Sequence, residues 1–336
     1  MRGIAVTTIA SQNSLGIQRL FKLAEITSSQ LVVIGDRKTP DWNQPSLPSF
    51  VHFFSLEDQA RKWPKLSTLL PHNHYARKNL AYLWAIENDI EVLLDTDDDN
   101  YAEVDIFEFS PRSYRLYTGS RQWVNTYAHF GRKEIWPRGL PLEEAYKPLE
   151  KTLRIEGSLN WHCFQSIVDG DPDLDAIGRM LNPHQQIFED EDHLILSANN
   201  FCPTNSQATL WKRPLFPFLY LPITSSFRMT DIWRGIIISG FQNLNGFQTA
   251  FGKLGFTQER NEHDLISDFV DEISGHVHNK RIKEIVDSLW SNNSSFDDTY
   301  SVFQAIYSEL VSIGILESEE IECVNEFIAH AHSLNS

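Results

Sequence analysis

Four carboxylates occupy five consecutive positions, from Asp95 to Asp99, directly after the apolar stretch 91–94. Carboxylates crowded this closely repel one another, and keeping each one ionised away from water is costly. A hard divalent cation relieves both costs, because Mg²⁺ and Mn²⁺ prefer carboxylate oxygens. In an extended segment, Asp97 and Asp99 would turn to one side and Asp98 to the other. We therefore predict that Asp97 and Asp99 hold Mn²⁺ or Mg²⁺, with a solvated acidic turn as the alternative.

An Asp-x-Asp element after a buried strand is typical of enzymes that use nucleotide sugars, in which a metal ion holds the diphosphate. The carboxyl ends of strands in an open α/β sheet are where such ligands bind. A metal at this position would neutralise charge as the diphosphate leaves. We expect Asp97 to contact the nucleotide as well as the metal.

Arg77 and Lys78 are two cations at the start of a helix that the apolar pattern predicts over 74–87, with Asn73 as its expected N-cap. The helix dipole disfavours positive charge at this end, so a nearby anion would explain the pair. A diphosphate fits, because a guanidinium matches phosphate oxygens in a fork. Asp95 would then orient one of these cations. A solvated basic pair is the alternative.

Polar residues follow the first two predicted strands. Thr7 and Thr8 end the first strand, where a Rossmann-like fold contacts its nucleotide. Asp36, after the second strand, can accept hydrogen bonds from a ribose hydroxyl or a base N–H, and Gly35 lets the backbone approach a ligand. We predict nucleotide binding by all four residues, with plain polar turns as the alternative.

Six ordered segments together resemble the STELLO-type glycosyltransferase-like family. They are more distantly similar to the plant reversibly glycosylated polypeptides, which are UDP-arabinopyranose mutases. The segments are 31–40, 70–86, 93–100, 135–142, 168–177 and 229–235. The resemblance extends from about residue 4 to about residue 240. It implies a GT-A fold, in which a Rossmann-like domain binds a nucleotide-sugar donor, most often a UDP-sugar.

The resemblance also implies two catalytic residues in the second half of the chain. The segment 136–139 matches the mutase segment whose arginine becomes glycosylated, and Arg138 stands at that position. The mutases carry a second arginine seven residues later, where this chain has Ala145, so we expect Arg138 to bind diphosphate or sugar instead. Asp231 stands where the mutases carry an acid, and it is the expected general base for the acceptor hydroxyl. A helix N-cap is the alternative for Asp231.

Short apolar runs that alternate with helical patterns predict an α/β domain with a central sheet, which we expect to be mixed and GT-A-like. The predicted strands are 3–7, 31–34, 51–54, 91–94 and 194–196, and the predicted helices are 15–25, 74–87 and 231–241. After residue 259, apolar residues recur at helical spacing. We therefore predict a glycosyltransferase domain over 1–259 and a helical region over 260–336. The C-terminal helices are expected to pack on the domain, with binding of a partner protein as the alternative.

Composition narrows the functional class and the compartment. The net charge of −16 argues against nucleic acid as a partner. Cys163, Cys202 and Cys323 are widely spaced, which predicts free buried thiols. No segment approaches the ~20 apolar residues of a membrane span, and the sequence has no signal-peptide pattern. We expect a cytoplasmic enzyme, with recruitment to the inner membrane through another protein as the alternative.

These features predict a metal-dependent glycosyltransferase that moves a sugar from a nucleotide-diphosphate donor to a glycan acceptor, in surface polysaccharide synthesis. A nucleotide-sugar mutase and a non-catalytic scaffold are the alternatives. Asp97, Asp99 and Arg77 disfavour the scaffold, and Ala145 disfavours the mutase.

Overall fold

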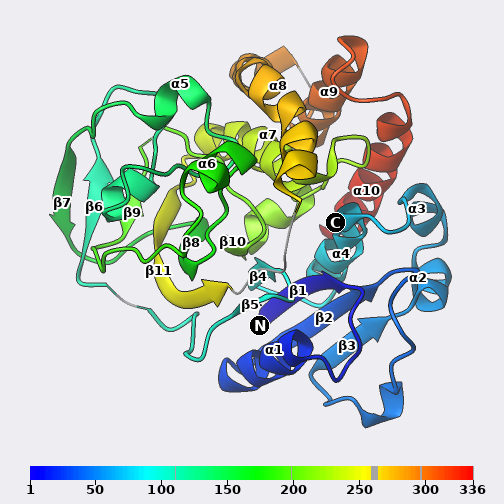
Figure 1. Cartoon of the computed structure of the whole chain (residues 1–336). Helices are drawn as coiled ribbons and strands as arrows, with labels where there is room; N and C mark the ends of the chain where they lie inside the picture. Colours follow the sequence, from blue (N-terminus) through cyan, green and yellow to red (C-terminus); the bar gives the residue numbers. More distant parts are fainter. Residues whose placement is uncertain (110, 198, 259–263, 296, 336) are drawn as a thin grey trace.

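The computed structural model describes residues 1–109, 111–197, 199–258, 264–295 and 297–335, and one mixed sheet of eleven strands forms its centre (Figure 1). The strands are β1 (Arg2–Thr8), β2 (Gln30–Gly35), β3 (Val51–Phe54), β4 (Val92–Thr96), β5 (Asn100–Tyr101), β6 (Ser113–Tyr117), β7 (Thr152–Glu156), β8 (Cys163–Gly170), β9 (Leu194–Ile195), β10 (Ala208–Lys212) and β11 (Thr249–Gln258). Their order across the sheet is β3-β2-β1-β4-β10-β8-β11-β9-β6-β7, and β5 pairs with β11.

Helices cover both faces of this sheet. The α-helices are α1 (Leu15–Ile26), α2 (Leu56–Lys62), α3 (Pro64–Leu69), α4 (Asn79–Glu87), α5 (Leu142–Ala145), α6 (Ala176–Leu181), α7 (Thr230–Leu244), α8 (Leu265–Ser291), α9 (Thr299–Ser312) and α10 (Glu319–Asn335). Short 3₁₀ helices are η1 (Gln44–Ser46), η2 (Tyr75–Lys78), η3 (Tyr127–Phe130), η4 (Arg213–Phe218), η5 (Phe227–Met229) and η6 (Asn293–Ser295).

The first half of the sheet is parallel and buried on both faces. Strands β3, β2, β1 and β4 run parallel, and β10 joins β4 in the antiparallel direction. Successive side chains of a strand point to opposite faces. Ile4 and Val6 of β1 accordingly lie in one apolar cluster with Ile17 of α1, while Ala5 lies in another with Leu80 of α4. The carboxyl ends of β1, β2 and β4 therefore meet at one edge.

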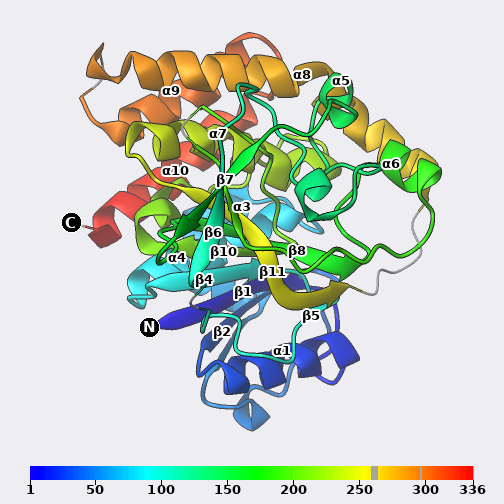
Figure 2. The same ribbon diagram turned by 90° about the vertical axis from the view of Figure 1, so that its left-hand side faces the viewer.

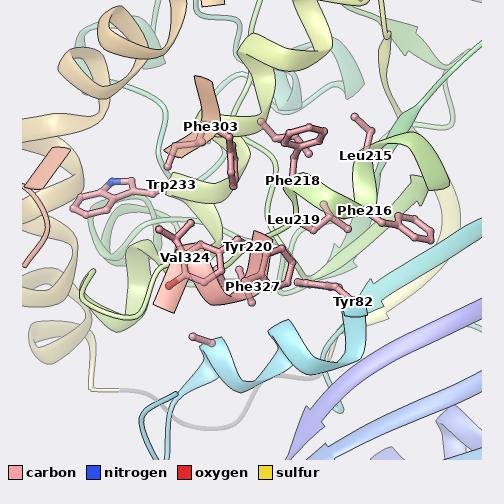
Figure 3. Packing of buried hydrophobic residues seen from close by; sticks show 14 of the residues in the cluster. Tyr82, Leu215, Phe216, Phe218, Leu219, Tyr220, Trp233, Phe303, Val324 and Phe327 are labelled. Atoms are coloured by element: carbon pink, nitrogen blue, oxygen red, sulfur yellow. The ribbon is translucent and has the colours of Figure 1, made fainter. Parts of the chain in front are cut away.

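The C-terminal helices share the core that α4 and α7 form. Figure 2 shows α8 lying along α7, on the side of the sheet away from α1. Phe303 of α9 and Phe327 of α10 lie in one cluster with Tyr82 of α4 and Tyr220 (Figure 3). Buried Glu320 of α10 accepts a hydrogen bond from the Tyr220 hydroxyl at 2.6 Å. These helices thus pack on the sheet domain, as expected.

The predicted helix over 74–87 is two elements, the 3₁₀ helix η2 followed by α4. His74 caps η2, because its Nδ1 accepts a hydrogen bond from the Ala76 N–H at 3.1 Å. The prediction of Asn73 as N-cap is wrong, since that residue precedes the cap and has a left-handed φ of 52°.

The mixed α/β architecture and the helical C-terminal region are confirmed, and the predicted strands and helices lie within a few residues of the observed ones. The predicted boundary between 259 and 260 falls in residues 259–263, outside the described part. Every helix in the described ranges is too short or too polar to cross a bilayer. The three cysteines are buried and free.

Candidate active site

A cavity of 410 Å³ lies at the edge where β1, β2 and β4 end. Seven of the ten residues predicted for the site line it, namely Thr7, Thr8, Asp36, Asp97, Asp99, Arg138 and Asp231. Gly35, Arg77 and Lys78 do not line it. The sequence prediction thus located the cavity, although several side chains in it differ in role from what we expected.

The acidic segment is a tight turn between β4 and β5, and it is not extended. Asp98 therefore lines the cavity beside Asp97 and Asp99, and the prediction that it faces away is wrong. The Thr8 hydroxyl donates a hydrogen bond to Asp98, and Gln258 Nε2 donates to Asp99 Oδ2 at 2.7 Å. These contacts join the turn to β1 and β11.

Gly16 in the first turn of α1 packs directly against this acidic turn. A Cβ atom on Gly16 would lie 1.9 Å from the carbonyl oxygen of Asp98, closer than any real contact allows. The absence of a side chain at Gly16 therefore permits the observed position of Asp98. Sequence analysis missed this residue, although a glycine inside a predicted helix is a recognised sign of close packing.

Asp97 is partly buried and lies among strong local charges. Its Oδ1 accepts hydrogen bonds from the Tyr75 hydroxyl at 3.0 Å and from Lys78 Nζ at 3.1 Å. Burial raises the pKa of Asp97 to about 7 despite the Lys78 ammonium, and the carboxylates of Asp99 and Asp95 add to the rise. Near neutral pH this carboxyl is poised to lose a proton when a cation binds.

Lys78 lies behind the acidic turn and is fully buried. Its ammonium contacts Asp95 Oδ1 at 2.9 Å as well as Asp97, which confirms that Asp95 orients one of the two cations. Burial of the ammonium lowers the pKa of Lys78, but the carboxylates of Asp95 and Asp97 raise it by more. The pKa of Lys78 is therefore above its ordinary value. The prediction that Lys78 binds a diphosphate directly is wrong, because its ammonium is committed to positioning Asp97.

Asp95 links the acidic turn to helix α7. Its Oδ2 accepts hydrogen bonds from the Tyr82 hydroxyl at 2.9 Å, the Ser206 hydroxyl at 2.7 Å and Arg234 Nη1 at 2.6 Å. Arg234 is fully buried on α7. The network therefore fixes the end of β4 against the helix that carries Asp231.

Arg77 supports the fold and does not reach the ligand cavity. Its side chain is 1% exposed. Its Nε donates to Gln59 Oε1 at 2.9 Å, and its Nη1 donates to the Leu70 carbonyl at 2.9 Å. The guanidinium thus satisfies carbonyl groups at the end of α3. The prediction that Arg77 contacts a diphosphate is wrong.

Loops after β1 and β2 form one part of the cavity lining. The Asp36 carboxylate accepts hydrogen bonds from the backbone N–H of Arg37 at 2.6 Å and of His74 at 3.1 Å, so it joins two of these loops. Gly35 instead packs on Phe53, whose ring carbons would lie 3.1 Å from an added Cβ. We therefore assign Gly35 a packing role in place of the predicted contact with a ligand.

Lys38 is an exposed cation on the cavity lining that sequence analysis missed. It lies three residues beyond the end of β2, within the segment 31–40 that carried part of the family resemblance. A cation that follows the Gly35-Asp36 pair at a strand end is the signal that could have identified it.

Arg138 is held between two carboxylates. Its Nε and Nη2 donate to the two oxygens of Asp173, each at 2.8 Å. Its Nη1 and Nη2 donate to the two oxygens of Asp231 at 3.1 and 3.0 Å, and Nη1 also donates to the Arg228 carbonyl. All five N–H groups of the guanidinium are used. Arg138 thus positions Asp173 and Asp231, and its contact with diphosphate or sugar stays a prediction.

Asp231 is a buried carboxylate in the first turn of α7. Besides Arg138, its Oδ1 accepts from the Ile232 N–H at 2.9 Å, and its Oδ2 accepts from the Ser206 N–H at 3.1 Å. A carboxylate has about four acceptor positions, and these contacts use all of them. The N-cap of α7 is Met229, so the capping alternative is wrong. The role of Asp231 as a general base stays a prediction, and the geometry favours a positioning role.

Helix α8 and the short helix η5 contribute cavity residues that sequence analysis missed. Asp268 and Asp271 of α8, with Phe227 and Arg228 of η5, also line the cavity. The sequence does contain a sign of these cavity residues. Two acidic residues stand three positions apart at the start of an amphipathic helix, and this spacing places both on one face. The C-terminal region thus contributes residues to the cavity as well as packing on the sheet domain.

The oxygen atoms of the acidic turn fit a divalent cation that is bound together with phosphate. The buried Asn100 Oδ1 has no hydrogen-bond partner among the described residues, and it follows Asp99 directly. Within the described ranges, no three His, Cys, Asp or Glu side chains are grouped closely enough to hold a metal on their own. Mg²⁺ sites commonly use one or two carboxylates and complete their coordination with phosphate oxygens and water.

No family model matches the chain. It is similar to the probable glycosyltransferase STELLO2 of Arabidopsis thaliana, with 27% identity over 306 residues that cover 84% of this chain and 39% of that protein. It is equally similar to the probable glycosyltransferase STELLO1 of the same plant, with 27% identity over 315 residues, 87% of this chain and 40% of that protein. The predicted resemblance to the STELLO-type family is confirmed, and the chain spans about two fifths of the length of these relatives.

One solved structure, described as a mycobacterial protein, matches with a TM-score of 0.42 at 10% identity. The match covers 83% of this chain and 74% of that chain. This likeness is too low to indicate a shared fold.

Proposed function

We propose that this chain is a metal-dependent glycosyltransferase of the GT-A type, which takes a sugar from a nucleotide-diphosphate donor, most often UDP-linked, and passes it to a glycan acceptor in surface polysaccharide synthesis. The observation that carries the proposal is the acidic turn 97–99, which follows a buried strand and faces the cavity at the carboxyl edge of the sheet. The names of the two STELLO relatives support the activity class.

The donor occupies the side of the cavity formed by β1, β2 and the acidic turn. Thr7, Thr8 and Asp36 face the nucleoside, and Lys38 supplies positive charge to the diphosphate. Asp97 and Asp99 hold Mn²⁺ or Mg²⁺, which supplies Lewis-acid stabilisation of the leaving diphosphate. Lys78 and Tyr75 keep Asp97 in place through the hydrogen bonds that its Oδ1 accepts.

The acceptor occupies the opposite side, between η5, α7 and α8. Arg138 locks Asp173 and Asp231 into fixed positions there. The fixed carboxylates hold the shape of this part of the cavity, and orientation of an acceptor against a fixed surface supplies a large part of catalysis in bimolecular transfer. The hydroxyl proton passes to a cavity carboxylate as the acceptor oxygen bonds to the sugar, while the bond from the sugar to the diphosphate oxygen breaks and the nucleoside diphosphate leaves.

A mutase is the less favoured alternative. Mutase-like chemistry needs an arginine nitrogen that can act as a nucleophile. Burial lowers the pKa of Arg138, but the carboxylates of Asp173 and Asp231 raise it by more, so the pKa is well above its ordinary value. This guanidinium therefore stays protonated and fully hydrogen-bonded. Its lone electron density is therefore unavailable for attack on a sugar.

Release of UDP from a panel of UDP-sugars tests the proposal. Wild-type protein with Mn²⁺ should hydrolyse one donor slowly, and a glycan acceptor should accelerate release. Asp99→Asn should abolish both reactions, whereas Asp41→Asn, which changes an exposed acid outside the cavity, should not. Conversion of UDP-arabinopyranose to the furanose form without an acceptor would instead establish the mutase.

A further inference from the structure

Phe227 lines the cavity with 54% of its surface exposed, although Arg228 and Met229 beside it are buried. Its ring lies 6.1 Å from the His74 ring and 6.3 Å from the Tyr75 ring, both edge to face. Because the Tyr75 hydroxyl contacts Asp97, Phe227 is one side chain away from the proposed metal ligands. The Phe227 ring thus lies between the proposed donor side and the proposed acceptor side of the cavity.

Helix η5 is clamped to α8 on both sides of Phe227, so the exposure of the ring does not result from a loose segment. On one side, the Ser226 hydroxyl donates to the Asp271 carbonyl at 2.5 Å. On the other side, Arg228 Nη2 contacts Glu272 Oε1 at 2.8 Å. A rigidly held, exposed aromatic ring at a cavity is suited to stack on a ligand.

Met229 reinforces the clamp. It packs so closely on α8 that a Cβ atom on Gly275 would lie 2.1 Å from its sulfur. The conformation of η5 is therefore fixed by the residues on either side of Phe227, and a truncation of Phe227 itself should leave η5 in place.

The charges on this side of the cavity select against anions. Asp173, Asp231, Asp268 and Asp271 line it, while the guanidinium of Arg138 is fully engaged by the first two. Arg228 also lines the cavity, and its guanidinium pairs with Glu272, which does not line it. With four carboxylates and two guanidinium groups, this set of lining residues is thus negative overall, and like charges across an interface cost several kcal/mol.

We propose that Phe227 and Asp271 form an acceptor subsite for an uncharged sugar ring, which stacks on Phe227 while its hydroxyl groups donate to the Asp271 carboxylate. Glycans that end in a uronic acid or carry phosphate are excluded by the net negative charge of these lining residues. This inference rests on the proposed function, since it assigns the acceptor half of the same cavity.

The test uses saturation-transfer NMR on the full chain with UDP and Mg²⁺ present. The probes are methyl glycosides of neutral hexoses and pentoses, and methyl glucuronide as the anionic counterpart. Wild-type protein should bind at least one neutral glycoside and not the glucuronide. Phe227→Ala and Asp271→Asn should each weaken that binding about three- to tenfold, in the range of one stacking contact.

Two controls match these variants. Tyr146→Ala removes an aromatic ring that is 63% exposed outside the cavity, and Glu284→Gln removes an exposed acid from the same helix as Asp271. Both should bind the glycoside as wild type does. UDP affinity, measured in parallel, should be unchanged in all four variants.

The outcomes distinguish a failure of the proposed function from a failure of the acceptor subsite. Wild-type protein that fails to bind UDP contradicts the proposed function. Normal UDP binding with glycoside binding unaffected by Phe227→Ala contradicts the subsite alone. Equal binding of glucuronide and neutral glycosides overturns the assignment of substrate class.

Discussion

In the proposed function, single residues of the acidic turn carry the chemistry, and Asp97 is the one whose ionisation matters most. Its carboxyl has a pKa of about 7, raised by burial and by the neighbouring carboxylates. The folded protein therefore binds more protons than the unfolded chain between about pH 4 and pH 7. This group lowers the free energy of unfolding of the metal-free protein as pH rises through that window.

Asp97→Asn removes this pH-dependent cost. At pH 8 without metal, we expect the variant to be more stable than wild type by about 1 kcal/mol, a value discounted because the side chain is partly exposed. Mn²⁺ should raise the melting temperature of wild type more at pH 8 than at pH 6, and should not affect the variant. Thermal unfolding with and without EDTA measures both effects. A wild-type response to Mn²⁺ that is equal at the two pH values would refute the assignment.

Arg138 provides a second prediction at this scale. Arg138→Lys leaves Asp173 and Asp231 buried with too few donors, and breaking a buried pair typically costs about 3–5 kcal/mol. We expect urea unfolding to show a loss of this order, whereas Arg37→Lys at an exposed position should be neutral. A stable Arg138→Lys protein that has lost only UDP affinity would mean that Arg138 contacts the diphosphate after all.

At the scale of elements, α1 positions the acidic turn through Gly16. Gly16→Ala places a methyl group against the Asp98 carbonyl, so the turn must move. Misplacement by about 1 Å can cost up to a hundredfold in a positioned site. We expect UDP affinity with Mn²⁺ to fall about ten- to hundredfold, with the helix intact by circular dichroism.

Glu25→Ala, at an exposed position of the same helix, is the matched control for Gly16→Ala and should bind as wild type does. Unchanged affinity in Gly16→Ala would show that the position of Asp98 is not critical.

Most helices and strands could be predicted from the periodicity of apolar residues, but the contacts of individual side chains could not. The apolar runs of β1, β2 and β4 mark strands buried on both faces, and those predictions hold. The cation pair in η2, just before α4, suggested an anion, yet Arg77 is satisfied by the carbonyl of Leu70 after α3 and by Gln59. Such acceptors come from other segments, and their positions depend on packing that the sequence pattern does not encode.

For the molecule as a whole, the C-terminal helices belong to the core that holds the site. Glu320 of α10 accepts hydrogen bonds from the N–H groups of Ile223 and Thr224, at 3.0 and 2.9 Å, in the loop before α7. Glu320→Ala leaves both N–H groups unpaired, at about 1–3 kcal/mol each. We expect a loss of about 2–6 kcal/mol in a single cooperative urea transition.

Glu319→Ala changes the exposed neighbour of Glu320 and should be neutral. Two separate transitions in Glu320→Ala would instead show that residues 260–336 unfold independently of the sheet domain.

The whole-molecule level was the hardest to predict. Asp97 could be assigned to the site because it follows its strand directly, but Asp271 reaches the cavity from a helix more than 150 residues away. Nothing local in α8 distinguishes a cavity acid from a solvated one. Only the packing of α8 on α7 and η5 brings it there.

Isothermal titration calorimetry with UDP tests the central claim most directly. The account predicts that UDP binds in the presence of Mn²⁺, that EDTA abolishes binding, and that Asp97→Asn and Asp99→Asn bind no better than wild type with EDTA. Equal UDP affinity with and without metal, or unimpaired binding by the Asp99→Asn protein, would contradict a donor site built on the acidic turn.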